Sequence, residues 1–159
     1  MNYRLFEPDD FDELYEIEEV CFQPPLRFSR RYMHQLIASP SAAIWIAESH
    51  GHLSGFGIVE WSEQAVGIFA YIQTIEVAPQ DRGRGIGSEL MRRLEGSANA
   101  EGAVAIWLHV DETNAPAIQL YRSHGYQHTG RTENYYTRGR AAEIYIKHLK
   151  PGYIETPHR

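Results

Sequence analysis

The chain has 159 residues, which suits a single domain large enough to hold a core and a cleft. Its formal net charge of −6 argues against a dedicated nucleic-acid-binding protein, which needs a basic face, and agrees with a cationic substrate such as an amine. The acidic N-terminus does not resemble a secretory signal, no apolar run approaches the roughly 20 residues that span a bilayer, and the single cysteine, Cys21, fits a reducing cytoplasm.

The first 40 residues predict a short strand and two helices. The strand is expected at residues 3–5 and the first helix at about 11–21, where the two prolines of Cys-Phe-Gln-Pro-Pro end it. Ser29 can cap a second helix that runs to about Ser39 and carries three side chains on one side: Tyr32, Met33 and Leu36. We expect the acidic run at 9–19 to be a solvent-exposed helix face.

Strands begin at residue 42. Residues 42–49 and 54–61 flank a His-Gly-His-Leu segment and predict a hairpin. The two histidines of this segment lack partners at metal-site spacing, so we expect a turn and no metal site. Residues 68–77 are rich in β-branched and aromatic side chains and predict a third strand.

A helix and a buried strand come next. Apolar side chains recur at helical spacing after the third strand: Ile86, Leu90 and Leu94. Residues 103–110 are nearly all apolar, as in a strand that is covered on both faces. Because strand, helix and strand follow in this order, residues 68–110 predict a right-handed parallel crossover.

The C-terminal part predicts one helix and a strand pair. Residues 114–125 read as a short helix, with Pro116 near its start and Gly125 at its end. Residues 126–136 and 141–149 are expected to form an antiparallel pair, and the tail at 151–159 is expected to be peripheral. The fold class is therefore mixed α/β with a central sheet, in one domain that covers residues 1–159.

Arginines and glycines join the third strand to its helix, and this loop matches neither of two common phosphate loops. A P-loop needs a lysine before its Ser or Thr, but Gly87 is followed directly by Ser88. A dinucleotide-binding loop needs G-x-G-x-x-G, and no glycine here starts that pattern. Backbone N–H groups at a helix N-terminus still favour an anion, and Arg82 and Arg84 add charge. A plain turn with solvated arginines is the alternative.

Two stretches together resemble the GNAT superfamily of acyl-CoA-dependent N-acetyltransferases. The first is Arg82-x-x-Gly85-x-Gly87, after a strand that ends in Val77-x-Pro79, and it is similar to the pyrophosphate loop of that superfamily. The second is similar to the next strand and helix, with matching residues at the expected places: Asn114, Ala117, Tyr121 and Gly125-Tyr126. The resemblance covers about residues 68–136, which would form the acetyl-CoA-binding core.

The resemblance implies a largely antiparallel mixed sheet, splayed at two parallel strands, with helices on both faces. Acetyl-CoA would enter the gap, its pantetheine arm pairing with the backbone of one strand and its pyrophosphate held by the glycine loop. The N–H of Val77 would face the thioester oxygen, where negative charge develops. The residues that the resemblance assigns to the cofactor are Ile75, Glu76, Val77, Arg82, Gly83, Arg84, Gly85, Ile86, Gly87, Ser88, Asn114, Ala117 and Tyr121.

The resemblance also implies direct transfer from acetyl-CoA to an amine in a ternary complex. His109 is our candidate base, because an imidazole titrates near ~6.5, close to working pH. A lone histidine in a strand would otherwise be a hydrogen-bonded core residue. Covalent catalysis would need a placed nucleophile, and we expect Cys21 to be a small buried apolar residue instead.

Tyr71 and His109 are similar to the tyrosine–histidine pair that binds a water near the substrate amine in eukaryotic-type N-terminal acetyltransferases. In the bacterial ribosomal-protein branch, the residue that matches His109 is usually a glutamate, so the chain departs from that branch here. In the histone-acetylating branch the base matches Gln73, which cannot serve. Tyr121 matches the tyrosine beside the departing sulfur. Packing in the strand is the alternative role for Tyr71.

Two further stretches favour a protein N-terminus as the acceptor. Arg-Thr-Glu-Asn-Tyr-Tyr resembles the hairpin of N-terminal acetyltransferases, whose paired tyrosines, here Tyr135 and Tyr136, cover the first residues of the peptide. The segment at 22–25 resembles their first-helix loop, in which Phe22 and Pro24 would form one wall of the slot. Cross-strand packing for the tyrosines and a simple helix stop for the proline are the alternatives.

The expected function is therefore acetyl-CoA-dependent acetylation of the α-amine at a protein N-terminus, in the cytoplasm. We expect no metal, no nucleic acid and no membrane as partners. Two other functions stay open from the residues alone. One is an enzyme that acetylates a small amine, such as a polyamine, an amino acid or an antibiotic, and the other is a non-catalytic module that senses acyl-CoA. An acyl group other than acetyl also stays open.

Overall fold

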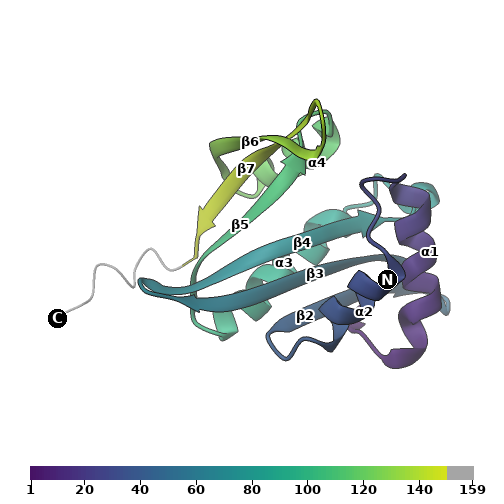
Figure 1. The fold of residues 1–159 in the computed structure, drawn as a ribbon. Coiled ribbons are helices and arrows are strands. Elements are labelled where there is room, and N and C mark those ends of the chain that lie inside the picture. Colours follow the sequence, from purple (N-terminus) through teal and green to yellow (C-terminus); the bar gives the residue numbers. More distant parts are fainter. Residues whose placement is uncertain (150–159) are drawn as a thin grey trace.

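The computed structural model describes residues 1–149, so the expected peripheral tail at 151–159 lies outside the described residues. The elements are shown in Figure 1 and are, in chain order, β1 (Asn2–Leu5), η1 (Pro8–Asp10), α1 (Phe11–Cys21), α2 (Arg30–Ala38), β2 (Ala42–Ser49), β3 (His52–Gln64), β4 (Gly67–Val77), η2 (Pro79–Asp81), α3 (Ile86–Ala100), β5 (Ala103–Asp111), α4 (Ala115–Ser123), β6 (Gln127–Thr137) and β7 (Arg140–His148). Every helix and strand expected from the sequence is present, and β3 is longer than expected because its hairpin with β4 extends to Gln64.

The strands of residues 1–149 form one seven-stranded sheet in the order β1-β2-β3-β4-β5-β7-β6. The β4–β5 pair is parallel and the other neighbouring pairs are antiparallel. The parallel pair is joined through α3, as the crossover predicted for residues 68–110 requires. The predicted mixed, largely antiparallel sheet is confirmed.

The sheet opens between its two parallel strands. Pairing of β4 with β5 runs only from Ile68 to Tyr71 on the β4 side, although β4 continues to Val77 and β5 continues to Asp111. In Figure 1 the strands β5, β6 and β7 diverge from β2, β3 and β4 beyond this point. The ends of β4 and β5 therefore have backbone groups that no neighbouring strand pairs, and the predicted splay is confirmed.

Helices cover both faces of the sheet, as predicted. On one face α1 and α2 pack on β2 and β3, with Leu14 and Met33 fully buried against Ile58 and its neighbours. On the other face α3 and α4 pack on β4 and β5, and Leu94 is fully buried there. Each such side chain stabilises the fold by about 1.5–3 kcal/mol through loss of apolar surface from water.

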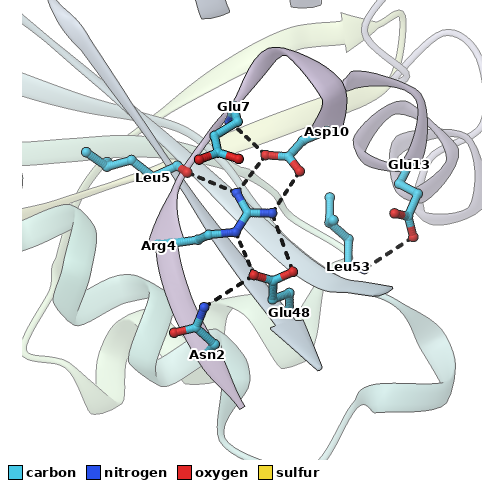
Figure 2. Close-up of polar contacts among 8 residues, drawn as sticks. All are labelled: Asn2, Arg4, Leu5, Glu7, Asp10, Glu13, Glu48 and Leu53. Atoms are coloured by element: carbon cyan, nitrogen blue, oxygen red, sulfur yellow. Dashed lines mark hydrogen bonds and ion pairs between the residues drawn. The ribbon is translucent and has the colours of Figure 1, made fainter. Parts of the chain in front are cut away.

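A charged cluster ties the first strand to the start of α1 (Figure 2). The two terminal nitrogens of Arg4 each donate to one carboxyl oxygen of Asp10 at 2.8 Å, and Arg4 Nε donates to Glu48 on β2 at 2.6 Å. The hydrogen bonds from Arg4 are the main cause that lowers the pKa of Asp10. The expectation that the acidic run at 9–19 is solvent-exposed is therefore wrong at Asp10, and it is also wrong at Glu18, which is 1% exposed.

The longest helix between residues 1 and 149 is α3, with 15 residues. No helix in this range has the length and apolar character needed to cross a bilayer.

Gly55 on β3 lets β4 lie close at the edge of the opening, and Gly55→Ala should destabilise the protein by about 1–3 kcal/mol. A Cβ at this position would lie 2.6 Å from the backbone oxygen of Glu76, so a strand has to shift. Gly96→Ala in α3 is the matched control, because its Cβ would meet nothing within 4 Å and alanine favours a helix interior by about 1 kcal/mol. Urea unfolding of both variants checks this, and equal stabilities would contradict the crowding at Gly55.

Candidate active site

Two cavities meet at the opening between β4 and β5. The larger, about 470 Å³, is walled by the end of β4, the glycine loop at 82–87 and α4. The smaller, about 90 Å³, is walled by α1, the segment at 22–28, β4, β5 and the β6 hairpin. Five residues line both, so that the cavities share one wall: Phe22, Ile75, Asn114, Ala117 and Tyr121. A molecule in one cavity would therefore lie next to a molecule in the other.

The glycine loop bends where only glycine is unstrained. Gly83 and Gly85 have φ angles of +81° and +79°, in the left-handed region that L side chains rarely adopt. Gly85 is the N-cap of α3, and the first N–H groups of the helix have no acceptor within it. These groups and the positive end of the helix dipole make the loop suitable for a phosphate.

The larger cavity contains all the predicted cofactor residues except Arg84 and Ser88. Arg84 pairs with Asp81 at 3.5 Å, and the hydroxyl of Ser88 is hydrogen-bonded to Nε2 of His124 at 2.6 Å. Asn114 caps α4 by accepting a hydrogen bond from the N–H of Ala117 at 3.2 Å.

Arg82 and Cys21 lie together at the rim of the larger cavity. The Arg82 guanidinium donates from Nε to the Val77 carbonyl oxygen at 3.0 Å and from a terminal nitrogen to Cys21 Sγ at 3.3 Å. Cys21 packs against the hydrophobic core but is only partly buried and also lines the cavity, so the expectation that it is a small buried apolar residue is confirmed in part. Burial raises the pKa of the Cys21 thiol, which keeps it protonated and a poor nucleophile.

The backbone of β4 presents a free donor to the opening. The N–H of Ala78 donates to Ser54 of β3 at 2.8 Å. Successive N–H groups of a strand point to opposite edges, so the N–H of Val77 faces away from β3, toward the gap where β5 no longer pairs.

Tyr71 and His109 form a direct hydrogen bond across the parallel pair, with 2.8 Å between the hydroxyl oxygen and Nδ1. Tyr135 stacks on the imidazole, with ring centroids 4.1 Å apart and planes 12° apart. Burial lowers the pKa of His109 below its ordinary value of 6.5, so the ring is neutral at pH 7. A neutral imidazole that lines the smaller cavity can accept a proton there.

Tyr71 is a neutral phenol that orients the imidazole. Burial raises its pKa far above the ordinary value of 10.0, and a hydrogen bond with Tyr135 raises it further. The hydroxyl therefore does not act as a base near neutral pH. Its hydrogen bond to Nδ1 of His109 fixes the orientation of the imidazole ring. Tyr121 is 7% exposed and lines both cavities, and burial is also the main cause that raises its pKa.

The predicted acceptor residues are divided between the cavities. Phe22 and Tyr136 line the smaller cavity. Tyr135 is 43% exposed and covers His109, with its ring against Tyr136 at 4.9 Å between centroids. Pro24 lines neither of the two cavities that meet at the opening, but a neighbouring surface cavity of about 450 Å³ that also contains Phe22.

Sequence reasoning missed several residues of the smaller cavity: Glu18, Leu26, Phe28 and Asp111. Glu18 follows Leu14 by four residues, and this spacing places it on the buried side of α1, so a helical wheel could have found it. Asp111 is held by Arg140 and Thr113. Burial alone would raise its pKa, but hydrogen bonds from Thr113 and Arg140 lower it overall.

Of the three side chains expected on one side of α2, Met33 and Leu36 are buried, but Tyr32 is not. Tyr32 is 37% exposed, and its hydroxyl donates to Gln73 Oε1 at 3.2 Å. The Gln73 amide in turn donates to Glu60 on β3. Gln73 of β4 therefore connects α2 to β3 through two hydrogen bonds at the edge of the smaller cavity.

A glycine loop at a helix N-terminus, a cavity at the opening of the sheet and a neutral imidazole in the adjoining cavity suit an enzyme that transfers a group from a large phosphorylated donor to a nucleophile. The model of the acetyltransferase (GNAT) family matches residues 11–126, and the chain belongs to this family. It is an acyltransferase of the N-acetyltransferase type, and its cosubstrate is acetyl-CoA.

Three known proteins illustrate the similarity. A Bacillus subtilis (strain 168) protein, provisionally named a [ribosomal protein bS18]-alanine N-acetyltransferase, is 36% identical over 137 residues, which are 86% of this chain and 85% of that protein. The streptothricin acetyltransferase of Streptomyces lavendulae is 43% identical over 96 residues, 58% of this chain and 48% of that enzyme. The structure of Arabidopsis thaliana NAA60 in complex with acetyl-CoA superposes with a TM-score of 0.82 at 20% identity, covering 94% of this chain and 98% of that one.

Arg82→Ala should weaken coenzyme A binding by about tenfold or more, because one charge-assisted hydrogen bond to the diphosphate is lost. Affinity for pantetheine, which has no diphosphate, should not change. Calorimetry with both ligands measures this, and Arg31→Ala on the exposed side of α2 is the control. Equal coenzyme A affinity of Arg82→Ala and the wild type would show that Arg82 does not hold the diphosphate.

Proposed function

We propose that the protein transfers acetyl from acetyl-CoA to the α-amine at the N-terminus of a protein. The observation that carries this proposal is the smaller cavity, a narrow slot of about 90 Å³ whose imidazole lies between two tyrosines, Tyr71 and Tyr135. A slot of this size admits an amine with little attached bulk. The similarity to the B. subtilis protein over most of both chains supports the same acceptor class.

In this proposal residues 1–159 are one N-acetyltransferase domain, and the acetyl-CoA-binding core covers about 68–136. The single cysteine of the chain is consistent with work in the cytoplasm. The larger cavity takes the pantetheine arm along the end of β4, beside Ile75, Glu76 and Val77. The glycine loop holds the diphosphate: the N–H groups of Ile86, Gly87 and Ser88 begin α3, and Arg82 and Arg84 supply charge. Gly83, Gly85, Asn114 and Ala117 complete the walls.

Acetyl-CoA supplies the acetyl group as a thioester and leaves as a thiol. His109 acts as the base: Nδ1–H donates to the Tyr71 oxygen, which leaves the lone pair of Nε2 to take one proton from the acceptor ammonium. The amine nitrogen then forms a bond to the carbonyl carbon as the carbon–sulfur bond breaks. The Val77 N–H stabilises the negative oxygen. Tyr121 gives its proton to the sulfur and regains one from the nitrogen.

Four side chains form the entry for the acceptor in this proposal. Tyr135 and Tyr136 cover one side of the slot, and Phe22 forms the opposite wall. Pro24 lies further out, in the neighbouring surface cavity, where it would contact later residues of the chain that enters.

A small-molecule amine is the second candidate acceptor. The similarity to streptothricin acetyltransferase is the observation that favours it, because that enzyme is named for an antibiotic substrate. The matched region spans about half of that enzyme, whereas the match to the B. subtilis protein spans most of it. We therefore propose the protein N-terminus as the acceptor in preference to a small-molecule amine.

Incubation of the protein with acetyl-CoA and short peptides should acetylate peptides with a free α-amine and leave matched peptides with a blocked α-amine unmodified. An α-amine, with a pKa of about 8, gives up its proton more easily than lysine at about 10.4. Intact mass spectrometry measures the products. His109→Gln should lower the rate by about 10²–10⁴-fold. Modification of blocked peptides at lysine would contradict the proposal.

Replacing both Tyr135 and Tyr136 by alanine should lower kcat/KM for peptides by about tenfold or more, because the cover of the slot is removed. The same assay with a small polyamine as acceptor distinguishes the two candidates. If the wild type prefers the polyamine and the variant keeps that activity, the acceptor is a small molecule.

A further inference from the structure

Two glutamates form a buried pair behind the smaller cavity. Glu18 of α1 is 1% exposed and Glu76 of β4 is 3% exposed. Each has one oxygen held by the protein: the Phe28 N–H donates to Glu18 Oε2 at 2.9 Å, and the Thr74 hydroxyl donates to Glu76 Oε2 at 2.8 Å. The neighbouring Glu18 is among the causes that raise the pKa of Glu76, so the two carboxyl groups lie close together.

The other oxygen of each carboxyl group is Oε1. Within residues 1–149 both Oε1 atoms are buried without a donor from another residue. Burial is the main cause that raises the pKa of Glu76 well above its ordinary value, and the neighbouring Glu18 raises it further, so Glu76 is the group that holds a proton. With one of the two carboxyl groups protonated, the pair carries one negative charge.

This negative charge has no counter-ion in the described part of the chain. Neither Glu18 nor Glu76 forms an ion pair with a Lys, Arg or His there, although the other acid of the smaller cavity, Asp111, is paired with Arg140. Cys21, which also lies near the pair, is a neutral thiol. An unpaired charge buried to this degree is costly, and a cation that enters the cavity would remove the cost.

The acceptor is such a cation. An α-amine with a pKa of about 8 is mostly ammonium at neutral pH. The smaller cavity has a volume of about 90 Å³, roughly that of three water molecules. Glu18 and His109 both line this cavity, so a nitrogen inside it lies near both groups.

We propose that the Glu18–Glu76 pair is the subsite that binds the ammonium group of the acceptor, with Glu18 Oε1 as the accepting atom, before His109 takes the proton. This inference rests on the proposed function, because it needs the smaller cavity to hold the acceptor. It assigns recognition of the cation and removal of its proton to different residues.

The test compares two peptides that differ only at the α-position, one with a free α-amine and one in which hydrogen replaces it. Binding is measured with coenzyme A present, so that no transfer occurs. The wild type should bind the amino peptide about tenfold or more tightly than the des-amino peptide. In the double variant Glu18→Gln, Glu76→Gln the two affinities should become equal, because the pair has lost its charge.

Two single variants control for other effects. In Glu76→Gln, the new amide can donate to Glu18 and still accept from Thr74, so the charge stays on Glu18 and the preference should persist. Glu19→Gln changes an exposed carboxylate on the same helix and should also leave the preference unchanged. Glu18→Gln alone removes the carboxylate that lines the smaller cavity, and Glu76, which does not line it, keeps the pKa that burial raises, so the preference should be reduced.

The steady-state kinetics of peptide acetylation give a second measurement, in variants that keep His109. Ammonium binding is a ground-state interaction, so Glu18→Gln, which keeps Glu76 beside the proposed pantetheine site, should raise KM for the peptide more than it changes kcat. A double variant that keeps both the preference and the wild-type KM would overturn the inference while acetyl transfer stands. A wild type that acetylates no free α-amine would instead overturn the proposed function. Removing a buried charge also removes the free-energy cost of its desolvation, so we expect the double variant to fold. The single variant Glu18→Gln tests the same inference independently.

Discussion

The site depends on a pair of parallel strands that stop pairing. β4 and β5 are hydrogen-bonded over only a few residues, and both continue beyond that point. Their separated edges keep backbone donors and acceptors that the sheet does not use, and the Val77 N–H is one of them. Unpaired backbone groups are costly unless something else bonds them. The loss of pairing between β4 and β5 therefore supplies both the polar lining and the space that a long, amide-bearing cosubstrate requires.

The rest of the fold surrounds this opening. The helices α1 to α4 cover the two faces of the sheet, and the glycine loop leads into α3, the helix that joins the separated strands. On the acceptor side, Tyr71 of β4 reaches across to His109 of β5 at the last paired rung. This hydrogen bond places the imidazole where the strands start to diverge, so the base that we propose lies at the smaller cavity.

Much of this architecture could be predicted because it depends on local patterns in the amino-acid sequence. Alternation, helical spacing and glycine positions indicated the elements, and the loop at Arg82–Gly87 with the Asn114–Tyr121 helix indicated the family that the comparisons confirm. Buried charge could not be predicted in the same way. Glu18 belongs to an acidic run that looks exposed, and only the packing of α1 on β4 shows that its carboxyl group meets Glu76. The exposed position of Tyr32 and the contact of Cys21 with Arg82 also depend on elements distant in sequence.

The wall shared by the two cavities has a consequence for how specificity can change. Because Phe22, Ile75, Asn114, Ala117 and Tyr121 line both cavities, a substitution at any of them would, in the proposed function, alter the donor site and the acceptor site together. Residues that line the smaller cavity and not the larger one, such as Leu26, Phe28 and Tyr136, are free of this coupling. In the proposed function, a change of acceptor that leaves coenzyme binding intact therefore has a restricted set of positions available, on the segment after α1 and on the β6–β7 hairpin.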